Sequence, residues 1–194
     1  AGMGDLLLDQ LDEARAQGDK LNYGTPGIGT VAHLGMELLK TKAGIAPVHV
    51  PYPGNPQVIT GLIGGQVQMA VGSVQGILPH IQRGAVRAIA ATGKNRSPKL
   101  PDVPTFVEMG FNHPVFALDG YLPMCAPAGT PRDILEKIAE GIREAAETPR
   151  LKELQSMFGI PVPPVATLAD ARRVWDSDSV QWIGMAEKLG IKLD

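Results

Sequence analysis

The stretch with the strongest chemical character is a glycine-rich loop, Gly-Thr-Pro-Gly-Ile-Gly-Thr, at residues 24–30. Residues 27–32 match the G-x-G-x-x-A pattern of dinucleotide-binding loops, which follow a strand and open a helix. Such loops also need an acidic residue about 20 positions later to hold the ribose, and no Asp or Glu lies between Glu37 and Asp102. The Gly-Lys-Ser/Thr ending of a P-loop is absent as well. The pattern therefore does not favour a nucleotide.

A loop of this kind still suits a small anion. The N-terminus of a helix presents unpaired N–H groups and a partial positive charge, which attract carboxylates as well as phosphates. Two further predicted strand-to-helix turns, at residues 52–56 and 72–74, have the same design. In a parallel sheet such turns meet at the carboxyl ends of the strands, where open α/β folds bind ligands. The three turns predict a carboxylate cradle, although each glycine taken singly could serve only to permit a tight turn.

The sequence contains no evident catalytic constellation. It has no G-x-S-x-G motif and no acidic pair within residues 38–101. His33 follows Thr30 on the first turn of a predicted helix, where it could contact a ligand or make a structural hydrogen bond, whereas His49 and His80 are expected to pack. The histidines are too scattered to suggest a metal motif. We therefore expect no enzyme, no cofactor and no metal.

Charge is unevenly distributed, although the net charge is only −2. Residues 38–101 contain no Asp or Glu, and they carry seven basic side chains: Lys40, Lys42, Arg83, Arg87, Lys94, Arg96 and Lys99. Such a segment can attract anions, or it can simply keep a surface soluble. Nucleic acid is disfavoured as the partner, because the segment has few aromatic residues to stack on bases and its basic residues are dispersed.

Strands and helices are expected to alternate over the first hundred residues. The predicted strands are four apolar runs at residues 21–23, 45–50, 67–71 and 86–92. The predicted helices are one from Asp5 to Gly18, one capped by Thr30, one capped by Asn55, and one over 74–83. This alternation predicts an α/β fold with a parallel sheet and helices on both faces.

The second half of the chain is predicted to be mainly helical. A short helix is expected at 105–109 and an extended connection or strand over 116–127. Capping signals at Thr130, Thr148 and Thr167 then open three helices. These helices have no strands of their own to cover, so they pack on the first hundred residues or on a sheet that this sequence does not contain.

The sequence contains few features that indicate a cellular compartment or attachment to a membrane. Cys125 is the single cysteine, so an intrachain disulfide is excluded, and its apolar neighbours predict a buried, inert thiol. No run approaches the ~18 apolar residues of a membrane span. The first residues do not have the pattern of a signal peptide.

Several long stretches resemble the substrate-binding receptors of tripartite tricarboxylate transporters, the Bug family of bacteria. They are residues 21–40, 48–92, 96–111 and 126–138, and the resemblance runs in order from about Asp5 to Asp194. It implies a type II periplasmic-binding-protein fold of two lobes that closes on a small carboxylate in the periplasm, without metal or cofactor.

The resemblance also implies that the N-terminal part of the first lobe is missing. Family members begin with a signal peptide and with strands of that lobe, including a glycine-rich loop that ends in an acidic residue. Residues 21–117 would form the second lobe. Residues 1–20 and 118–194 would belong to the partial first lobe, which explains helices without a sheet.

The family's ligand loops fall on three places in this chain. The Y-G-S/T-x-G-x-G-T/S loop begins at Tyr23, the P-Y-x-G turn begins at Pro51, and the third loop begins at Gly72. The resemblance thus implies a ligand site made of Tyr23, Thr25, Gly27, Gly29, Thr30, His33, Tyr52, Gly54, Asn55, Gly72 and Ser73. Pro26 replaces a residue that is often serine and removes a backbone N–H. Gly72 stands where many relatives have an aspartate, so the identity of the carboxylate is left open.

The function implied by the resemblance is a receptor that captures a small carboxylate and works with membrane transporter subunits. An alternative is the effector-binding domain of a transcription regulator of the same two-lobed fold, which a preceding helix-turn-helix would reveal. An NAD-dependent oxidoreductase is a third class, disfavoured because the ribose-binding acid is absent. The exposed edge of a partial lobe further predicts self-association.

Overall fold

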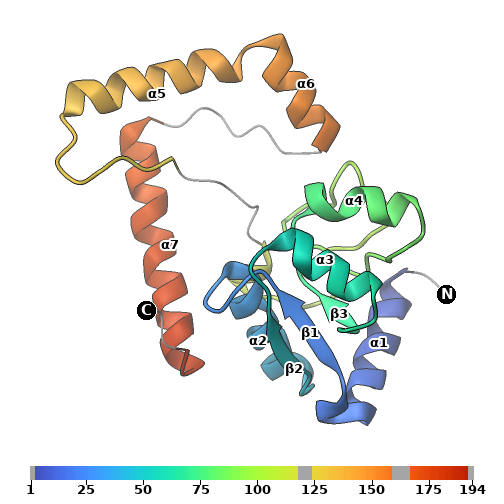
Figure 1. The fold of residues 1–194 in the computed structure, drawn as a ribbon. Helices are drawn as coiled ribbons and strands as arrows, with labels where there is room; N and C mark the ends of the chain where they lie inside the picture. The colour runs from blue at the N-terminus through green and yellow to red at the C-terminus, as the bar shows by residue number, and fades with distance from the viewer. Residues whose placement is uncertain (1–2, 118–123, 159–166, 192–194) are drawn as a thin grey trace. The chain divides into compact units, whose positions relative to one another are not determined.

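A computed structural model describes residues 3–117, 124–158 and 167–191 of the chain (Figure 1). The chain divides into two compact units. Unit 1 comprises Ala1–Asp119 with Gly184–Asp194, and unit 2 comprises Gly120–Ile183. Each unit is described by itself below.

Unit 1 is built around a parallel sheet of three strands. The strands are β1 (Asn22–Thr25), β2 (Val48–Pro51) and β3 (Met69–Ala70), in the order β2-β1-β3. Tyr23 lies opposite His49 on one side and opposite Met69 on the other. The parallel α/β arrangement predicted from the sequence is confirmed, although β3 is shorter than the apolar run at 67–71. Parallel pairing places the carboxyl ends of all three strands on one edge.

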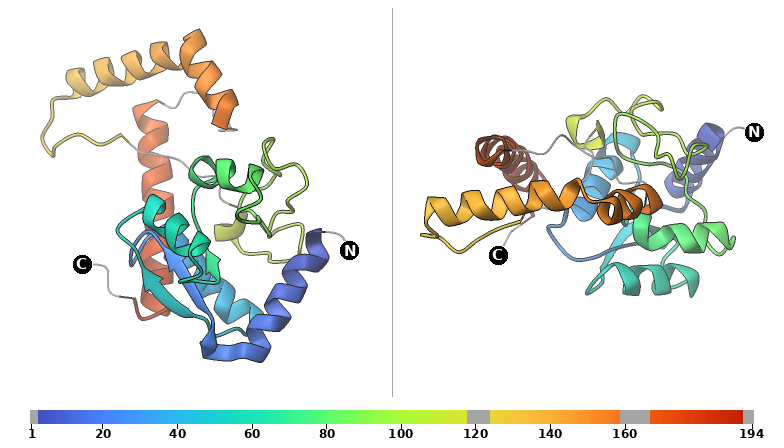
Figure 2. Two further views of the ribbon diagram at one scale, coloured as in Figure 1. Left: turned by 45° about the vertical axis from the view of Figure 1, so that its right-hand side comes forward. Right: turned by 90° about the horizontal axis from the view of Figure 1, so that it is seen from above.

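Helices cover both faces of this sheet, as two views agree (Figures 1 and 2). The helices α3 (Asn55–Ile63) and α4 (Val74–Gln82) lie on one face, and α1 (Met3–Gln17) and α2 (Val31–Ala43) lie on the other. The core between them includes Tyr23, Leu34, Val58, Val67 and Phe116, each no more than 2% exposed.

The helix α1 packs within unit 1. Leu11 and Ala14 are buried, and the Nε of Arg15 donates a hydrogen bond to the carbonyl of Ala43 over 2.8 Å. The predicted helix is confirmed, and a short 3₁₀ turn (Gly18–Lys20) follows it. The resemblance assigns residues 1–20 to the other lobe, and that division into lobes stays a prediction.

One of the three helix starts at the sheet edge differs by one residue from the sequence prediction. Thr30 caps α2 as predicted, because its Oγ1 accepts the N–H of His33 over 3.3 Å. Asn55 was predicted to cap α3, but it is the first helical residue and Gly54 occupies the cap position without a side-chain hydrogen bond. Pro56, which lacks an N–H, therefore lies in the first turn where no intrahelical donor is needed.

Two predicted elements between residues 84 and 111 are wrong. The segment 86–92 is extended but forms only an isolated bridge, Ala91 with Thr105, because its remaining backbone finds no ladder partner within the described residues. The predicted helix at 105–109 is a turn. Its Met109 N–H reaches the carbonyl of Thr105, but the glycine at 110 has a φ of +88° and ends it.

Unit 2 is helical, with α5 (Arg132–Ala146), α6 (Pro149–Phe158) and most of α7 (Leu168–Lys188). Thr148 and Thr167 cap α6 and α7 as predicted, with Oγ1 accepting the N–H of Leu151 and of Asp170 respectively. Thr130 was predicted to cap α5, and this is wrong. Its hydroxyl donates to the carbonyl of Pro127 over 2.7 Å, and the helix begins two residues later.

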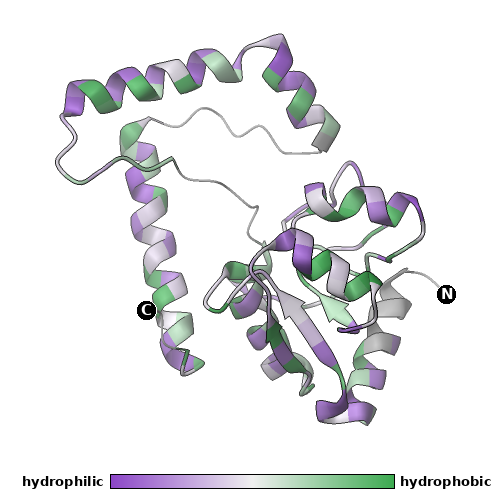
Figure 3. Ribbon diagram, viewed as in Figure 1, coloured by the Kyte–Doolittle hydropathy of each residue, from purple (hydrophilic) through white to green (hydrophobic). Residues whose placement is uncertain are grey.

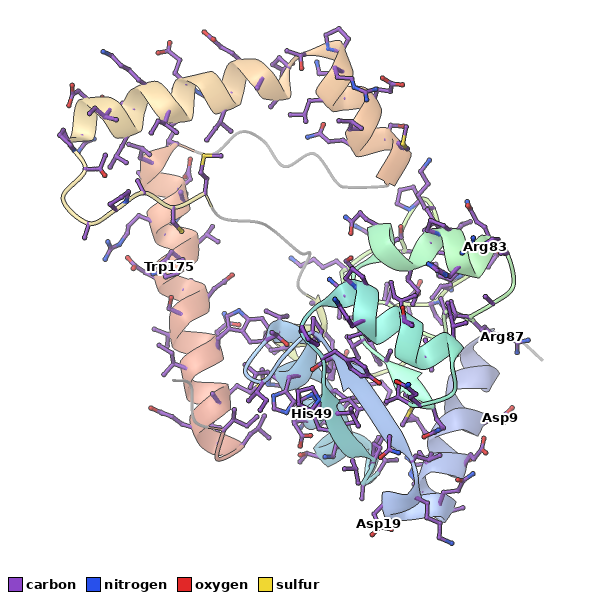
Figure 4. All side chains as sticks on the ribbon, viewed as in Figure 1. Asp9, Asp19, His49, Arg83, Arg87 and Trp175 are labelled. Carbon is purple, nitrogen blue, oxygen red and sulfur yellow. The ribbon has the colours of Figure 1, made fainter. Side chains whose placement is uncertain are left out.

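The helices of unit 2 expose apolar side chains. None of the residues of α5 is buried, and Ile134, Ile138 and Ile142 recur every fourth position on it with 41–44% exposure. Apolar and polar residues alternate along this helix (Figure 3). Trp175 on α7 is 52% exposed (Figure 4). An apolar face at helical spacing normally covers another element.

Three further sequence expectations can be placed. Cys125 was predicted to be buried, but it is exposed, because 124–127 is a segment without helix or strand that packs against nothing described. Residues 116–117 belong to a 3₁₀ helix (Pro114–Ala117), and 118–123 lie outside the described residues. Within the described chain, none of the helices has the length and apolar character of a membrane span.

Candidate ligand-binding site

Three strand-to-helix turns lie together at one edge of the sheet, as predicted. Two hydrogen bonds join them: the N–H of Tyr52 donates to Thr25 O over 2.9 Å, and the N–H of Val71 donates to Gly24 O over 3.1 Å. The second and third turns also touch, since a Cβ on Gly72 would lie 3.1 Å from Oδ1 of Asn55. The starts of α2, α3 and α4 therefore share one edge.

The first loop is shaped by two glycines with positive φ. Gly27 has a φ of +124° and Gly29 a φ of +74°, conformations that side chains disfavour. The loop is fixed on its inner side by Thr25 and Thr30, whose hydroxyls both donate to the carbonyl of Gly27, over 3.1 and 2.9 Å. Its glycines are thus required by conformation, as the loop pattern indicated.

Some backbone amides of this loop donate hydrogen bonds within the protein, and others do not. The N–H of Gly29 donates to Nδ1 of His33 over 3.1 Å, and the N–H of His33 donates to Thr30. For the amides of Thr30, Val31 and Ala32, the described residues provide no acceptor. These three N–H groups, at the positive end of α2, remain for an anion.

Beneath the loop, two imidazoles are stacked. The rings of His33 and His49 lie with centroids 4.0 Å apart and an angle of 15° between their planes. Nε2 of His49 is 2.7 Å from Oγ1 of Thr25, and the ring of Tyr23 stacks on the other side at 4.9 Å. Loop, strand β1 and strand β2 are therefore joined through one polar cluster.

A carboxylate closes this cluster. Glu37 accepts a hydrogen bond from the hydroxyl of Tyr23 and one from Nζ of Lys40, the latter over 2.7 Å. Burial pushes the pKa of Glu37 upward, but the hydrogen bonds and positive charge outweigh this effect, so its pKa is lowered. Burial, and then the carboxylate, raise the pKa of Tyr23 far above its ordinary value. Glu37 is thus ionised and Tyr23 neutral.

Both histidines are held in the neutral form. Burial lowers the pKa of His33, with Lys40 adding to the effect and Glu37 opposing it. Burial, together with the charge of His33, lowers the pKa of His49 to about 4. A neutral His33 is required by its bond to Gly29, since Nδ1 can accept an N–H only when it carries no proton.

The predicted site residues divide into two groups. Gly27, Gly29, Thr30, Tyr52, Gly54 and Asn55 are partly exposed at the sheet edge, and Gly72 and Ser73 are exposed there. Tyr23 and Thr25 are 0% exposed and His33 is 6% exposed, so their side chains lie behind the loop. Ligand contact by any of these residues stays a prediction.

Two apolar residues beside the loop were not singled out from the sequence. Ile28 is 64% exposed and Val31 is 58% exposed, which makes them an apolar rim next to the free amides. No signal in the sequence marked their exposure, because apolar side chains are ordinarily expected to pack inward. Glu37 and Lys40 were also missed as partners, and His49, expected only to pack, makes a polar contact with Thr25.

Two cavities lie away from this edge. One, of about 550 Å³, is lined by Ile81 and by residues 84–88 and 99–103, and the other, of about 330 Å³, is lined by Lys42, residues 110–113 and Phe116. No group of His, Cys, Asp or Glu suited to a metal ion occurs within the described part of the chain.

Charge near the site is partly neutralised. Of the seven basic residues in the acid-free segment, Lys40 pairs with Glu37, and Arg96 pairs with Glu108 at 2.9 Å. Arg83 and Arg87 lie at and beyond the end of α4, and Asp9 and Asp19 lie on and after α1 (Figure 4). Helix N-termini, rather than lysine or arginine, supply the positive character of the loop edge.

Comparison with protein families identifies the chain. Residues 5–190 match the family described as "Tripartite tricarboxylate transporter family receptor", TctC. The chain belongs to the TctC family. The family predicted from the loop motifs is thereby confirmed, and it is a family of receptors, in agreement with the lack of a catalytic motif in the sequence.

Other TctC-like proteins are similar over most of this chain. Protein BugT of Bordetella pertussis is 31% identical over 193 residues, which cover 97% of this chain and 58% of BugT. The UPF0065 protein in the tcbD-tcbE intergenic region of Pseudomonas sp. strain P51 is 33% identical over 89% of this chain and 51% of its own length. The chain spans about half the length of these curated relatives.

Solved structures confirm the predicted periplasmic-binding-protein fold. A structure of "R. palustris Rpa4515 with adipate" has a TM-score of 0.81 at 26% identity, covering 95% of this chain and 60% of that one. The malate-bound MatC of Rhodopseudomonas palustris has a TM-score of 0.74 at 25% identity, covering 92% of this chain and 61% of MatC.

Proposed function

We propose that this chain supplies one side of a binding site for a small carboxylate in a periplasmic receptor. The supporting observation is the edge where three helix N-termini meet and where the amides of Thr30, Val31 and Ala32 have no described acceptor. Oriented amides at a helix start bind carboxylates without a cationic side chain. The exposed Ile28 and Val31 add an apolar rim for the carbon skeleton of the ligand.

The similar structures support a linear or hydroxylated dicarboxylate as the first candidate ligand. One of them contains adipate and another contains malate, and both match more than nine-tenths of this chain. Membership in the TctC family supports a role beside membrane transporter subunits and a periplasmic location. Adipate and malate are therefore the probes to use first.

A substitution at the first position of α2 tests the role of the loop amides. Val31→Pro removes one free N–H at a position where proline fits a helix, and Val31→Ala is the matched control that keeps the N–H. We expect Val31→Pro to weaken malate or adipate binding about tenfold relative to Val31→Ala, since a hydrogen bond to a charged group is worth ~1.5–3 kcal/mol. Calorimetry on the natural chain that contains these residues measures this.

The outcomes of this experiment are distinct. Equal affinities of the two Val31 variants for a ligand that the parent chain binds would contradict carboxylate binding at this loop. Loss of binding in both variants together with a lowered unfolding temperature would mean that position 31 is needed for folding. Ala32→Pro would then be compared with Ala32→Gly in the same assay. Equal affinities of that second pair would contradict the proposal as well.

We also propose that the 194-residue chain by itself associates with a second copy. The support is the stripe of Ile134, Ile138 and Ile142 on α5, which has no buried residue. The short strand β3 adds to it, because it lies at the edge of the sheet and pairs with one strand among the described residues. Apolar faces and open strand edges promote association between copies.

A further inference from the structure

His33 is buried and His49 is half-buried, and the hydrogen bonds of both imidazoles are made to the protein itself. His33 is 6% exposed, and its Nδ1 faces the N–H of Gly29 at 3.1 Å. His49 reaches the other end of the loop through Thr25, at 2.7 Å. The loop is thus held at both ends by a pair of rings that are stacked on each other.

The protons in this cluster can be counted. The hydroxyl of Thr25 has one proton and two neighbours, the carbonyl of Gly27 at 3.1 Å and Nε2 of His49 at 2.7 Å. A carbonyl only accepts, so when the hydroxyl donates to Gly27, Nε2 of His49 must be the donor to Thr25. On the other ring, Nδ1 of His33 accepts from Gly29 and therefore carries no proton. Both rings then have a proton on Nε2, and His49 is neutral as well because burial lowers its pKa.

We propose that His33 is a positioning residue for the carboxylate loop: through its neutral Nδ1 it fixes the amide of Gly29 inward, and this holds the amides of Thr30, Val31 and Ala32 outward for the ligand. The ligand part of this proposal rests on the proposed function. Of the two roles that the position of His33 in the sequence left open, ligand contact and a structural hydrogen bond, the proposal assigns the second. It also removes the Gly29 amide from the donors of the cradle.

The charged and titratable groups around His33 come from three elements. Glu37 and Lys40 belong to its own helix, Tyr23 comes from β1, and His49 comes from β2. Glu37 is already engaged by Tyr23 and Lys40. A proton on Nδ1 of His33 would place a donor against the N–H of Gly29 and would break the bond that shapes the loop. Because the pKa of His33 is lowered by burial, positioning is intact at neutral pH and is lost as the pH falls below 6.5.

Two variants of His33 separate positioning from packing. His33→Phe keeps the volume and the stacking on His49 but removes the acceptor. His33→Asn loses the stacking and keeps an acceptor near the place of Nδ1. His80→Phe, on α4 and away from the loop, is the control for a histidine-to-phenylalanine change. All are compared with the parent protein, which is the natural chain that contains these residues, in the free form and with malate or adipate.

The first measurement is nuclear magnetic resonance of the free protein and needs no ligand. In the parent protein we expect His33 to have the nitrogen shifts of the Nε2–H tautomer, and the Gly29 amide to be protected from exchange at pH 7. His33→Phe should raise the exchange rate of that amide at least tenfold, and His33→Asn should restore most of the protection. An unprotected Gly29 amide in the parent, or unchanged exchange in His33→Phe, would overturn the proposal.

The second measurement is ligand affinity by calorimetry. We expect His33→Phe to bind five- to tenfold more weakly, His33→Asn within about twofold of the parent, and His80→Phe unchanged. Equal loss in His33→Phe and His33→Asn would indicate packing and overturn the proposal. If the Gly29 amide responds as described and the parent binds no carboxylate, the proposed function fails while positioning stands. If Val31→Pro abolishes binding and the exchange rate of the Gly29 amide is unchanged in His33→Phe, the proposed function stands and the positioning role of His33 fails.

Discussion

At the scale of single residues, the half-buried cluster behind the loop contains one ion pair, Glu37 with Lys40, and two neutral imidazole rings. The carboxylate of Glu37 is offset by Lys40 at 2.7 Å and by the hydroxyl of Tyr23. Lys40 also lies 5.5 Å from the centre of the Tyr23 ring, within the range of a cation–π contact. A buried carboxylate needs such partners, because an unpaired one would be expensive.

The two imidazoles predict a dependence of stability on pH. Folding lowers the pKa of His49 to about 4 and lowers the pKa of His33, so the unfolded chain takes up these protons at higher pH than the folded one. Stability is therefore fully present above pH 6.5 and falls as the pH decreases toward 4. We expect a fall of about 2 kcal/mol in the free energy of unfolding between pH 7 and 4.5, after allowing for partial exposure.

Urea denaturation at several pH values measures this fall, and His49→Gln is the matched variant, because its amide can still donate to Thr25. The variant should lose about half of the fall or more, with the remainder coming from His33 and from His113, whose pKa is also lowered by burial. An identical pH profile in the parent and in His49→Gln would show that these rings are not held neutral by folding.

Whether a residue of the loop region is buried or exposed was harder to predict from the sequence than the position of the loop itself. Thr25 and Tyr23 belong to a four-residue strand, and both are fully buried although they adjoin the ligand edge. In a parallel strand covered on both faces, alternation does not mark an outer side. The motif therefore located the loop correctly, but only coordinates separate Thr25, Tyr23 and His33 from the exposed residues.

At the scale of elements, one close contact fixes α3 on the sheet. The ring of Tyr52 lies against two glycines: a Cβ on Gly24 would be 3.1 Å from its Cε2, and a Cβ on Gly61 would be 2.3 Å from its hydroxyl oxygen. Gly61 is buried in α3. The absence of side chains at these two positions lets the tyrosine lie between β1 and α3.

This contact predicts opposite effects for two glycine-to-alanine changes. In a helix interior alanine is ordinarily better than glycine by about 0.5–1 kcal/mol, and Gly35 in α2 has no atom within 4 Å of its missing Cβ. Gly35→Ala should therefore stabilise the chain by that amount. Gly61→Ala should destabilise it by about 1–3 kcal/mol through overpacking against Tyr52. Equilibrium denaturation compares them.

A double variant completes this comparison. Gly61→Ala combined with Tyr52→Leu should recover most of the lost stability, because the shorter side chain vacates the space next to residue 61. Stabilisation by Gly61→Ala alone would mean that the tyrosine moves aside freely and does not fix α3.

Three of the predicted helix caps are confirmed, whereas one predicted strand, at 86–92, is wrong. Thr30, Thr148 and Thr167 cap their helices as the sequence indicated, since a cap depends on residues a few positions apart. The apolar run at 86–92 has strand composition, but a strand also needs a neighbour, and only Ala91 finds one in the described chain. Thr130 failed as a cap because α5 begins only at Arg132, which places Pro131 at the cap position.

At the scale of the whole molecule, a chain with one side of a cleft should bind weakly. A helix terminus contributes ~0.3–1 kcal/mol to anion binding, and up to ~2 when partly buried. Three such termini give ~1–3 kcal/mol, and ~6 kcal/mol at most, whereas micromolar affinity requires roughly 8. We expect the isolated 194-residue chain to bind malate or adipate with a dissociation constant far above micromolar. A micromolar constant from calorimetry would contradict this account.

The exposed apolar stripe makes the isolated chain prone to association. Sedimentation in reducing buffer should give a mass above that of the 20.5 kDa monomer. Ile138→Asn should shift the chain toward the monomer, whereas Lys137→Asn, at the neighbouring exposed position on α5, should not. A monomeric parent chain at tens of micromolar would exclude the proposed self-association.

The thiol of Cys125 is a natural site for covalent labelling of this chain. It is exposed, and the sequence contains no second cysteine. A maleimide fluorophore will therefore attach at Cys125, a few residues before α5, and no cysteine has to be introduced. In an oxidising space the same sulfur can bridge only to a different molecule, so a covalent pair visible on a non-reducing gel is the signature of storage without reductant.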